Sequence, residues 1–175
     1  GSVGGATYMN AGAYGGEMSK IISSVTYLDC ESEEIKTIGC DECDFSYRHS
    51  IFMDQKCVIL SIIIELEKAD KDYIDSKMSD YMQRRRDKQP LEYPSAGSVF
   101  KRPEGYFAGA LIEQSGLKGT SVGGAQVSEK HAGFIINRGN ATCNDVISLI
   151  DIIKSTVYQK FNVELECEVR PIGNK

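Results

Sequence analysis

The chain has 175 residues, of which 41% are hydrophobic and 26% are charged, and its formal net charge is −5. This composition is typical of a soluble globular protein and excludes an intrinsically disordered chain. The negative charge argues against a nucleic-acid-binding protein, which needs a basic surface to attract phosphates. The longest apolar run, Val58 to Ile64, is much shorter than the roughly 20 residues of a membrane span, so we expect no membrane partner.

The segment from Gly1 to Gly16 holds six glycines, with small residues and two tyrosines between them. Such a backbone can approach a ligand closely and point its N–H groups at a pyrophosphate, which suits a flavin or a nucleotide. We expect an irregular segment rather than the dinucleotide-binding fingerprint, because no strand precedes it and no helix opens from it. A plain flexible terminus is the alternative.

The next part of the chain predicts mainly β structure. Residues 21–29 and 34–38 are rich in the residue types that favour strands, and residues 41–45 fit one helical turn. Residues 57–66, CVILSIIIEL, are almost continuously apolar, which is typical of a strand covered on both faces.

Six cysteines occur in a chain that shows no secretory signal. Cys40 and Cys43 have the spacing of half a zinc site or of a redox pair. A structural zinc site needs a second pair, and His49 and His131 are isolated. We therefore expect free thiols and no metal, with a zinc-stabilised structural protein as an alternative.

Residues 70–86 place apolar side chains at helical spacing among charges, which predicts an amphipathic helix joining two units. The boundary falls near Lys68, so we expect one domain over residues 1–68 and a second over residues 69–175. The fold class is α+β.

The second domain alternates helices and strands. We expect a helix over residues 106–114, strands over 122–127 and 133–137, and a helix that ends near Phe161. The last helix begins at Thr142, which forms a capping box with Asp145. Residues 163–170 alternate apolar and charged side chains, which predicts a final half-buried strand with Glu168 on its solvated face.

An irregular loop, QPLEYPSAGSVFKRP, runs from Gln89 to Pro103 and leads into a short strand containing Val99 and Phe100. Loops of this kind often carry functional residues. Ser98 follows Gly97, where the backbone can bend sharply. From the residue types alone, a surface turn with a solvated serine is the simpler interpretation.

The run PSAGSVFKRP resembles the signature of the bacterial UDP-N-acetylenolpyruvoylglucosamine reductases, flavoenzymes also called UDP-N-acetylmuramate dehydrogenases or MurB. Three further stretches resemble the family in its order: GSVGGATYMNAGAYGG at 1–16, YRHSIF at 47–52 and LECEVRPIG at 165–173. The resemblance therefore extends along the whole chain. It implies the C-terminal portion of an FAD-binding α+β domain in residues 1–68, followed by the mixed α/β substrate-binding domain of MurB in residues 69–175.

Two departures from the family pattern refine the expectation. The family has a further region before the motif at 1–16, so the chain resembles an N-terminally truncated member. Between Leu66 and Lys88 there is no room for an inserted loop found in one branch of the family, which indicates the type II branch. Arg102 replaces an asparagine that part of the family has at this place.

The resemblance also implies residue roles. Ser98 falls at the family's proton donor, Glu168 at its catalytic carboxylate and Arg48, an ordinary surface arginine by residue type, at its catalytic arginine. The residues placed against FAD are Gly4, Gly5, Ala13 and Tyr14. The candidates for substrate binding are Tyr47, Gln89, Lys101 and Arg102.

The implied activity is the reduction of UDP-N-acetylglucosamine enolpyruvate to UDP-N-acetylmuramate, with NADPH as reductant and FAD as cofactor. This reaction belongs to peptidoglycan precursor synthesis in the bacterial cytoplasm. The alternative is that the chain acts only as a UDP-sugar-binding module without flavin or catalysis. The sequence does not determine the oligomeric state.

Overall fold

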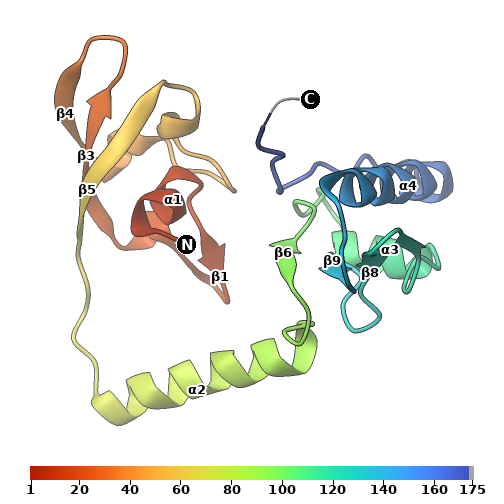
Figure 1. Ribbon diagram of the computed structural model, residues 1–175. Helices are drawn as coiled ribbons and strands as arrows, with labels where there is room; N and C mark the ends of the chain where they lie inside the picture. Colours follow the sequence, from red (N-terminus) through yellow and green to blue (C-terminus); the bar gives the residue numbers. More distant parts are fainter. Residues whose placement is uncertain (174–175) are drawn as a thin grey trace. The chain divides into compact units, whose positions relative to one another are not determined.

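The computed structural model describes residues 1–173, which divide into two compact units (Figure 1). The first unit covers Gly1–Ser76 and the second begins at Lys77, so the division falls inside helix α2 (Lys71–Lys88). The domain boundary near Lys68 stays a prediction. No residue of α2 is buried, and its apolar residues Ile74, Met78 and Met82 are exposed.

The first unit is built on a small antiparallel sheet with strand order β4-β3-β5. The central strand is β3 (Ile22–Asp29), and its neighbours are β4 (Glu34–Gly39) and β5 (Cys57–Ile64). The shorter elements are helix α1 (Val3–Tyr8), the hairpin of β1 (Gly12–Ala13) and β2 (Gly16–Glu17), and the 3₁₀ turns Met18–Lys20, Cys40–Cys43 and Ile51–Met53.

The core of the first unit forms where β3 packs on the 3₁₀ turns. Val25, Cys43 and Phe52 are fully buried, and the rings of Tyr27 and Phe52 meet edge to face at 5.3 Å. This pairing suits aromatic quadrupoles and adds to the gain from burying the rings. The predicted strands at residues 21–29 and 34–38 and the turn near residue 41 are therefore found close to their expected positions.

The N-terminal segment differs from the expectation, because α1 is a short helix and not an irregular loop. The Ser2 side chain accepts a hydrogen bond from the Gly5 N–H at 3.0 Å and so caps the helix. A serine cap satisfies one of the N–H groups that lack partners in a helix's first turn, which offsets the low helix propensity of the glycines.

Strand β5 is present as predicted, but the expectation that both its faces are covered is wrong for the part of the chain that the structure describes. Val58 and Leu60 are each 51% exposed and Ile63 is 63% exposed. The reason is position: β5 lies at the edge of the sheet and pairs with β3 alone among the described strands. A continuous apolar run signals burial but does not say which partner provides it.

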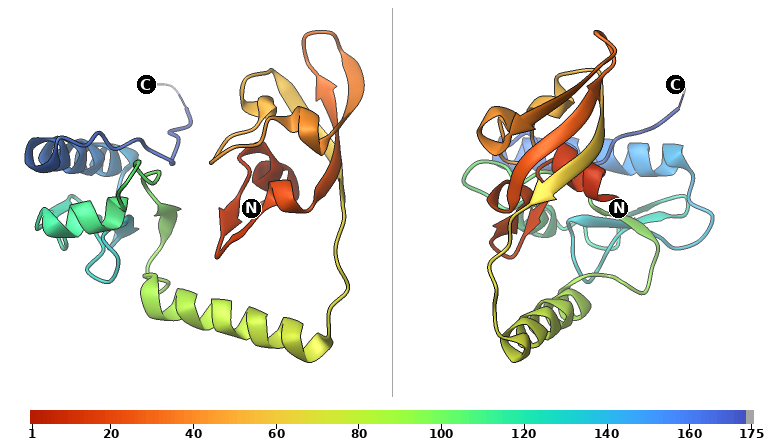
Figure 2. Two further views of the ribbon diagram at one scale, coloured as in Figure 1. Left: turned by 180° about the vertical axis from the view of Figure 1, so that it is seen from behind. Right: turned by 90° about the vertical axis from the view of Figure 1, so that its left-hand side faces the viewer.

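The second unit has an antiparallel sheet with strand order β6-β9-β8-β7. Its helices α3 and α4 lie next to these short strands in the views of Figure 2. The elements are β6 (Ser95–Ser98), α3 (Ala108–Gln114), β7 (Ser121–Val122), β8 (Ala125–Val127), β9 (Phe134–Asn137) and α4 (Cys143–Phe161).

Helix α4 carries the core of this unit. Leu149, Ile153 and Val157 are fully buried, as their helical spacing predicts. The Thr142 hydroxyl accepts from the Asp145 N–H at 3.1 Å, and the Asp145 carboxylate accepts from the Thr142 N–H at 2.8 Å. The predicted capping box therefore exists and begins the helix where the sequence placed it.

The single strand expected over residues 122–127 is instead a tight hairpin of β7 and β8. Gly123 has φ of +53°, a conformation that side chains rarely adopt. A Cβ atom at Gly124 would lie 2.1 Å from the Gly139 carbonyl oxygen. The turn at Gly123 and Gly124 therefore requires glycine where it approaches the loop that contains Gly139. A strand prediction from local residue types does not include this contact between distant loops.

The strand expected over residues 163–170 is also absent from the described structure, which has only an isolated bridge between Phe100 and Cys167. The predicted alternation of burial persists, since Leu165 is 2% exposed while Glu164 and Glu166 are exposed. The backbone hydrogen bonds between this segment and residues 99–101 are too few to form a continuous β-ladder.

Among residues 1–173, none of the helices combines the length and the apolar character that a membrane crossing requires.

Candidate active site

Ser98 and Glu168 lie in two chain segments that are joined by backbone hydrogen bonds. The Val99 carbonyl accepts from the Glu168 N–H at 2.8 Å and from the Val169 N–H at 3.5 Å. One residue further, Phe100 and Cys167 form an antiparallel bridge. The structure therefore brings together two candidate catalytic residues that are far apart in the sequence.

The backbone around Ser98 explains how its hydroxyl reaches the surface. Gly97 has φ of +87°, and the pairing of β6 with β9 shifts register between Ser95 and Ser98. Such irregularities bend a strand and redirect a side chain, and they are frequent beside functional sites. Ser98 is exposed and Glu168 is half-buried, so both are accessible to a ligand.

Two cations follow Ser98 and are held by neighbouring groups. The Lys101 ammonium forms an ion pair with Glu166. The Arg102 Nε donates to the Tyr106 carbonyl at 3.3 Å, and the guanidinium carbon lies 4.0 Å from the centre of the Phe107 ring. Stacking on an aromatic ring fixes the plane of a guanidinium and so prepares it to bind a planar or anionic group.

Gln89 stands at the junction between α2 and the loop that leads to Ser98. Its backbone N–H donates to the Arg85 carbonyl at 2.8 Å and continues the last turn of the helix. The side chain is half-buried, and the next residue, Pro90, is fully buried. The buried Pro90 therefore anchors the C-terminal end of α2 in the second unit.

In the first unit, Arg48 occupies a tight turn between Ser46 and His49. Its φ of +55° is unusual for a residue with a long side chain. Its Nη2 donates to the Gly12 carbonyl at 3.0 Å, and its guanidinium carbon lies 5.1 Å from the centre of the Tyr47 ring. A residue held in a costly backbone conformation marks a candidate functional position.

The residues expected to contact FAD also belong to the first unit. Gly4 and Gly5 lie in the first turn of α1, while Ala13 and Tyr14 are exposed at the β1–β2 hairpin. Gly4, Gly5 and Ala13 have no side chain or a small one, which allows a ligand to approach the backbone closely, and Tyr14 adds an exposed aromatic ring. The Arg48 hydrogen bond to Gly12 joins this surface to the turn that carries the candidate arginine.

His131 is a half-buried titratable residue that no sequence motif singled out as a candidate for the functional site. Its Nδ1 accepts from the Gly133 N–H at 3.1 Å, and its ring meets Phe134 edge to face at 5.0 Å. Burial lowers the pKa of His131, which favours the neutral ring. Only the folded chain reveals this environment.

The cysteines in the described residues are free thiols. Burial raises the pKa of Cys43 to about 11, and its thiol donates to the Gly39 carbonyl at 3.2 Å. The Cys40 thiol donates to the Ser19 carbonyl at 3.3 Å. Within residues 1–173, no group of three or more His, Cys, Asp or Glu side chains is arranged to hold a metal ion.

The fold and the sequence both relate this α+β chain to a class of reductases. Residues 89–172 match the model of the C-terminal domain of UDP-N-acetylenolpyruvoylglucosamine reductase. The crystal structure of the enzyme of that class from Thermus caldophilus aligns with a TM-score of 0.81 and 34% sequence identity, covering 97% of this chain and 60% of that chain.

Curated relatives match the chain along its whole length. Reductases of the same description from Clostridium novyi and Latilactobacillus sakei are 56% and 54% identical over 175 residues. The chain belongs to the UDP-N-acetylenolpyruvoylglucosamine reductase family, and the α+β fold class is confirmed. The match covers 100% of this chain and 57% of the length of each of these two relatives.

Proposed function

We propose that the chain carries catalytic residues for the reduction of UDP-N-acetylglucosamine enolpyruvate to UDP-N-acetylmuramate, with NADPH as the reductant and FAD as the cofactor. The reaction serves peptidoglycan precursor and cell-wall synthesis in the bacterial cytoplasm. The single observation that carries the proposal is the hydrogen bonding of Val99 to the Glu168 segment, which sets Ser98 and Glu168 next to each other.

FAD, held at Gly4, Gly5, Ala13 and Tyr14 and reduced by NADPH, would supply a hydride for the β-carbon of the enolpyruvyl double bond. Negative charge then develops on the α-carbon and spreads into the adjoining carboxylate of the substrate, which calls for a fixed cation and directed hydrogen bonds. Arg48 provides a planar fork of N–H donors for that carboxylate. Glu168, when protonated, donates a hydrogen bond to that carboxylate and so polarises it, and Ser98 delivers the proton to the α-carbon.

The rest of the substrate needs cations and hydrogen-bond donors. Lys101 and Arg102 supply positive charge to the diphosphate, with Arg102 already oriented on the Phe107 ring. Gln89 and Tyr47 supply polar contacts. In this assignment Tyr47 and Arg48 share a turn, so the stacking of the two side chains positions the arginine for the carboxylate.

A visible absorption spectrum tests the proposal directly. The chain is mixed with FAD, freed of unbound flavin by gel filtration, and scanned before and after anaerobic addition of NADPH. We expect a retained flavin band that NADPH bleaches and that UDP-N-acetylglucosamine enolpyruvate restores. A flavin band that bleaches but does not return with this substrate would contradict the assigned reaction.

The second candidate is a UDP-sugar-binding module without flavin. It is favoured by the fact that Lys101, Arg102 and Gln89 all belong to residues 89–172, which match the C-terminal domain as a unit. Isothermal titration with UDP-N-acetylglucosamine distinguishes the two candidates. Heat of binding from a chain that retains no flavin supports the module and rejects catalysis by this chain.

A further inference from the structure

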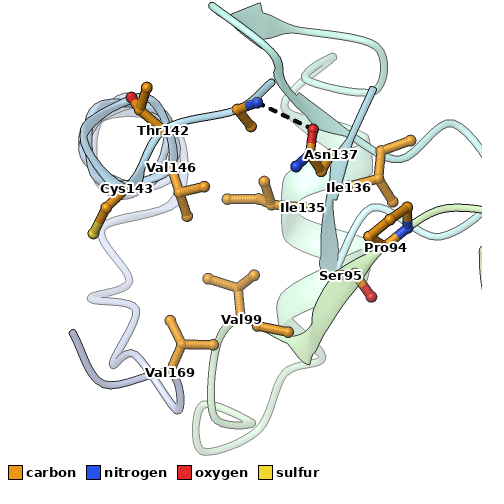
Figure 3. Close-up of a pocket in the computed structure, with 12 residues that line it drawn as sticks. Pro94, Ser95, Val99, Ile135, Ile136, Asn137, Thr142, Cys143, Val146 and Val169 are labelled. Atoms are coloured by element: carbon orange, nitrogen blue, oxygen red, sulfur yellow. Dashed lines mark hydrogen bonds between the residues drawn. The ribbon is translucent and has the colours of Figure 1, made fainter. Parts of the chain in front are cut away.

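A pocket of about 400 Å³ lies in the second unit, on a part of the surface that the candidate active site does not use (Figure 3). Its wall comes from the first turn of α4, from β6 and β9, and from the segment after Glu168. The side chains of Val99, Ile135, Val146 and Val169 surround the opening in Figure 3. A volume of this size falls in the range of small-molecule sites.

The chemistry of the lining defines the ligand. None of the twelve residues that line the pocket carries a charge at neutral pH, and most of them are aliphatic. No charged side chain in the lining can pair with an ion, so the pocket favours a neutral molecule. Its volume accommodates a compact molecule of about ten to twenty non-hydrogen atoms.

The polar rim adds one directional feature. The Asn137 Oδ1 accepts from the backbone N–H groups of Gly139 and Ala141 at 2.9 and 3.1 Å. This orientation leaves the amide nitrogen of Asn137 on the side of the pocket, as Figure 3 shows. A buried ligand needs an acceptor opposite such a donor, so a carbonyl group is the matching function.

The floor of the pocket is joined to the candidate active site by the backbone. Val99 follows Ser98, and its carbonyl accepts from the N–H groups of Glu168 and Val169. Val99 is 2% exposed and lines the pocket, whereas the neighbouring Ser98 is exposed. A ligand that displaces Val99 or Val169 therefore also moves the peptide unit that holds Glu168.

We propose that this pocket binds a neutral and mainly apolar small molecule with one carbonyl acceptor, and that its occupancy changes the position of Glu168 through the Val99 carbonyl. The binding itself follows from the pocket alone. The consequence for catalysis rests on the proposed function, because only there does Glu168 act on a substrate.

Methyl and amide NMR of the 175-residue chain tests the proposal with coumarin as the probe. Coumarin is neutral, flat and has one carbonyl acceptor. We expect saturable shifts of the methyl signals of Val99, Val146 and Val169 together with the amide signal of Glu168. Coumarin-3-carboxylate, which adds a charged carboxylate group to the same ring system, should cause at least tenfold smaller shifts at the same concentration.

Substitutions in α4 provide the matched control. Val146→Phe fills the pocket and should weaken coumarin binding at least tenfold, whereas Ile147→Phe, at the next and exposed position outside the pocket, should leave binding unchanged. Amide spectra of α4 report whether Val146→Phe folds. If it does not, Ala141→Leu fills the same pocket from the segment before the helix.

Two results would overturn the proposal. Shifts that persist in the folded Val146→Phe or Ala141→Leu chain would reject the pocket as the site. Saturable methyl shifts with an unmoved Glu168 amide would reject the communication to Glu168. Neither measurement involves flavin, NADPH or substrate, so a failure here is separate from a failure of the proposed reductase function.

Discussion

Ser98 is placed by features that act on the backbone rather than on its own side chain. Gly97 provides the left-handed turn, and the bulge within β6 directs the next side chain outward. The hydroxyl is consequently exposed while the following Val99 is buried. A serine displayed in this way is suited to donate a proton to a ligand that lies across the end of the strand.

The Ser98→Ala substitution tests this role. A positioned general acid contributes about 10²- to 10⁴-fold in rate, so substrate reduction should fall by that factor. Bleaching of the flavin by NADPH should be unchanged, because it precedes the proton transfer. Stopped-flow absorbance of the two half-reactions measures both, with Ser155→Ala on the exposed face of α4 as the control. Equal losses in the two half-reactions would refute the assignment.

At the scale of residues, the motifs predicted which side chains to examine but not their surroundings. The strained turn of Arg48 and its hydrogen bond to Gly12 join positions 36 residues apart. His131 likewise lies against Gly109, which is distant in the sequence: a Cβ atom at Gly109 would be 3.2 Å from the Cε1 atom of His131. Local sequence patterns do not contain contacts of this range, so these features emerge only from the structure.

Helix α4 is the element whose start is most directly encoded. Removing the cap with Thr142→Ala should lower the free energy of unfolding by about 1 kcal/mol, because the Asp145 N–H group in the first turn of the helix loses its acceptor. Urea denaturation followed by circular dichroism measures the change. Thr156→Ala, in the interior of the same helix, serves as the control and should have a smaller effect. An unchanged midpoint in Thr142→Ala would contradict the capping role.

Asp145, the second residue of the capping box, makes the stability of the fold depend on pH. The backbone hydrogen bond from Thr142 lowers the pKa of Asp145 below its ordinary value of 3.8. The folded state therefore binds protons less readily than the unfolded state, so this contribution is complete above about pH 4 and is lost as the pH falls through the lowered pKa.

Stability measured from pH 6 downward should consequently decline less steeply in Asp145→Asn than in the parent chain. Asp151→Asn, on the exposed side of α4, is the control. The interpretation fails if Asp145→Asn retains the parent's full acid-induced decline.

Strand β5 leads to a prediction about association. It is an edge strand with exposed apolar residues, and such edges pair readily with a further strand. Leu60→Lys places a charge on this edge and should reduce self-association of the chain. Sedimentation at several concentrations measures it, and Leu91→Lys, an exposed position in the second unit, is the control. If both variants and the parent chain self-associate equally, the edge of β5 is not the surface through which the chain associates.

At the scale of the whole molecule, each unit has its own hydrophobic core. One cluster contains Phe52 and Val25, and the other contains Leu149, Ile153 and Val157. Phe52→Ala and Leu149→Ala each create a cavity in a core. The free energy of unfolding should fall by about 3–5 kcal/mol for Phe52→Ala and by about 2–5 kcal/mol for Leu149→Ala. Hydrogen exchange should show the loss of protection in the substituted unit.

Mass spectrometry of peptides from β3 and from α4 resolves the two responses. Phe52→Ala should increase exchange in β3 and leave α4 protected, and Leu149→Ala should do the reverse. Ile152→Ala, at a 38% exposed position of α4, controls for substitution within that helix. Equal loss of protection in both peptides from either variant would mean that the two cores unfold as one.

The sequence by itself determined the α+β class, the order of most elements, the start of α4 and the family to which the motifs point. These depend on local periodicity, caps and short motifs, which a linear pattern records. Only the tertiary structure decided that β5 is an edge strand, that residues 121–127 form a hairpin, and that the segment after Leu165 joins the chain beyond Ser98. Each of these depends on contacts between residues distant in the sequence, where packing and backbone pairing override local preference.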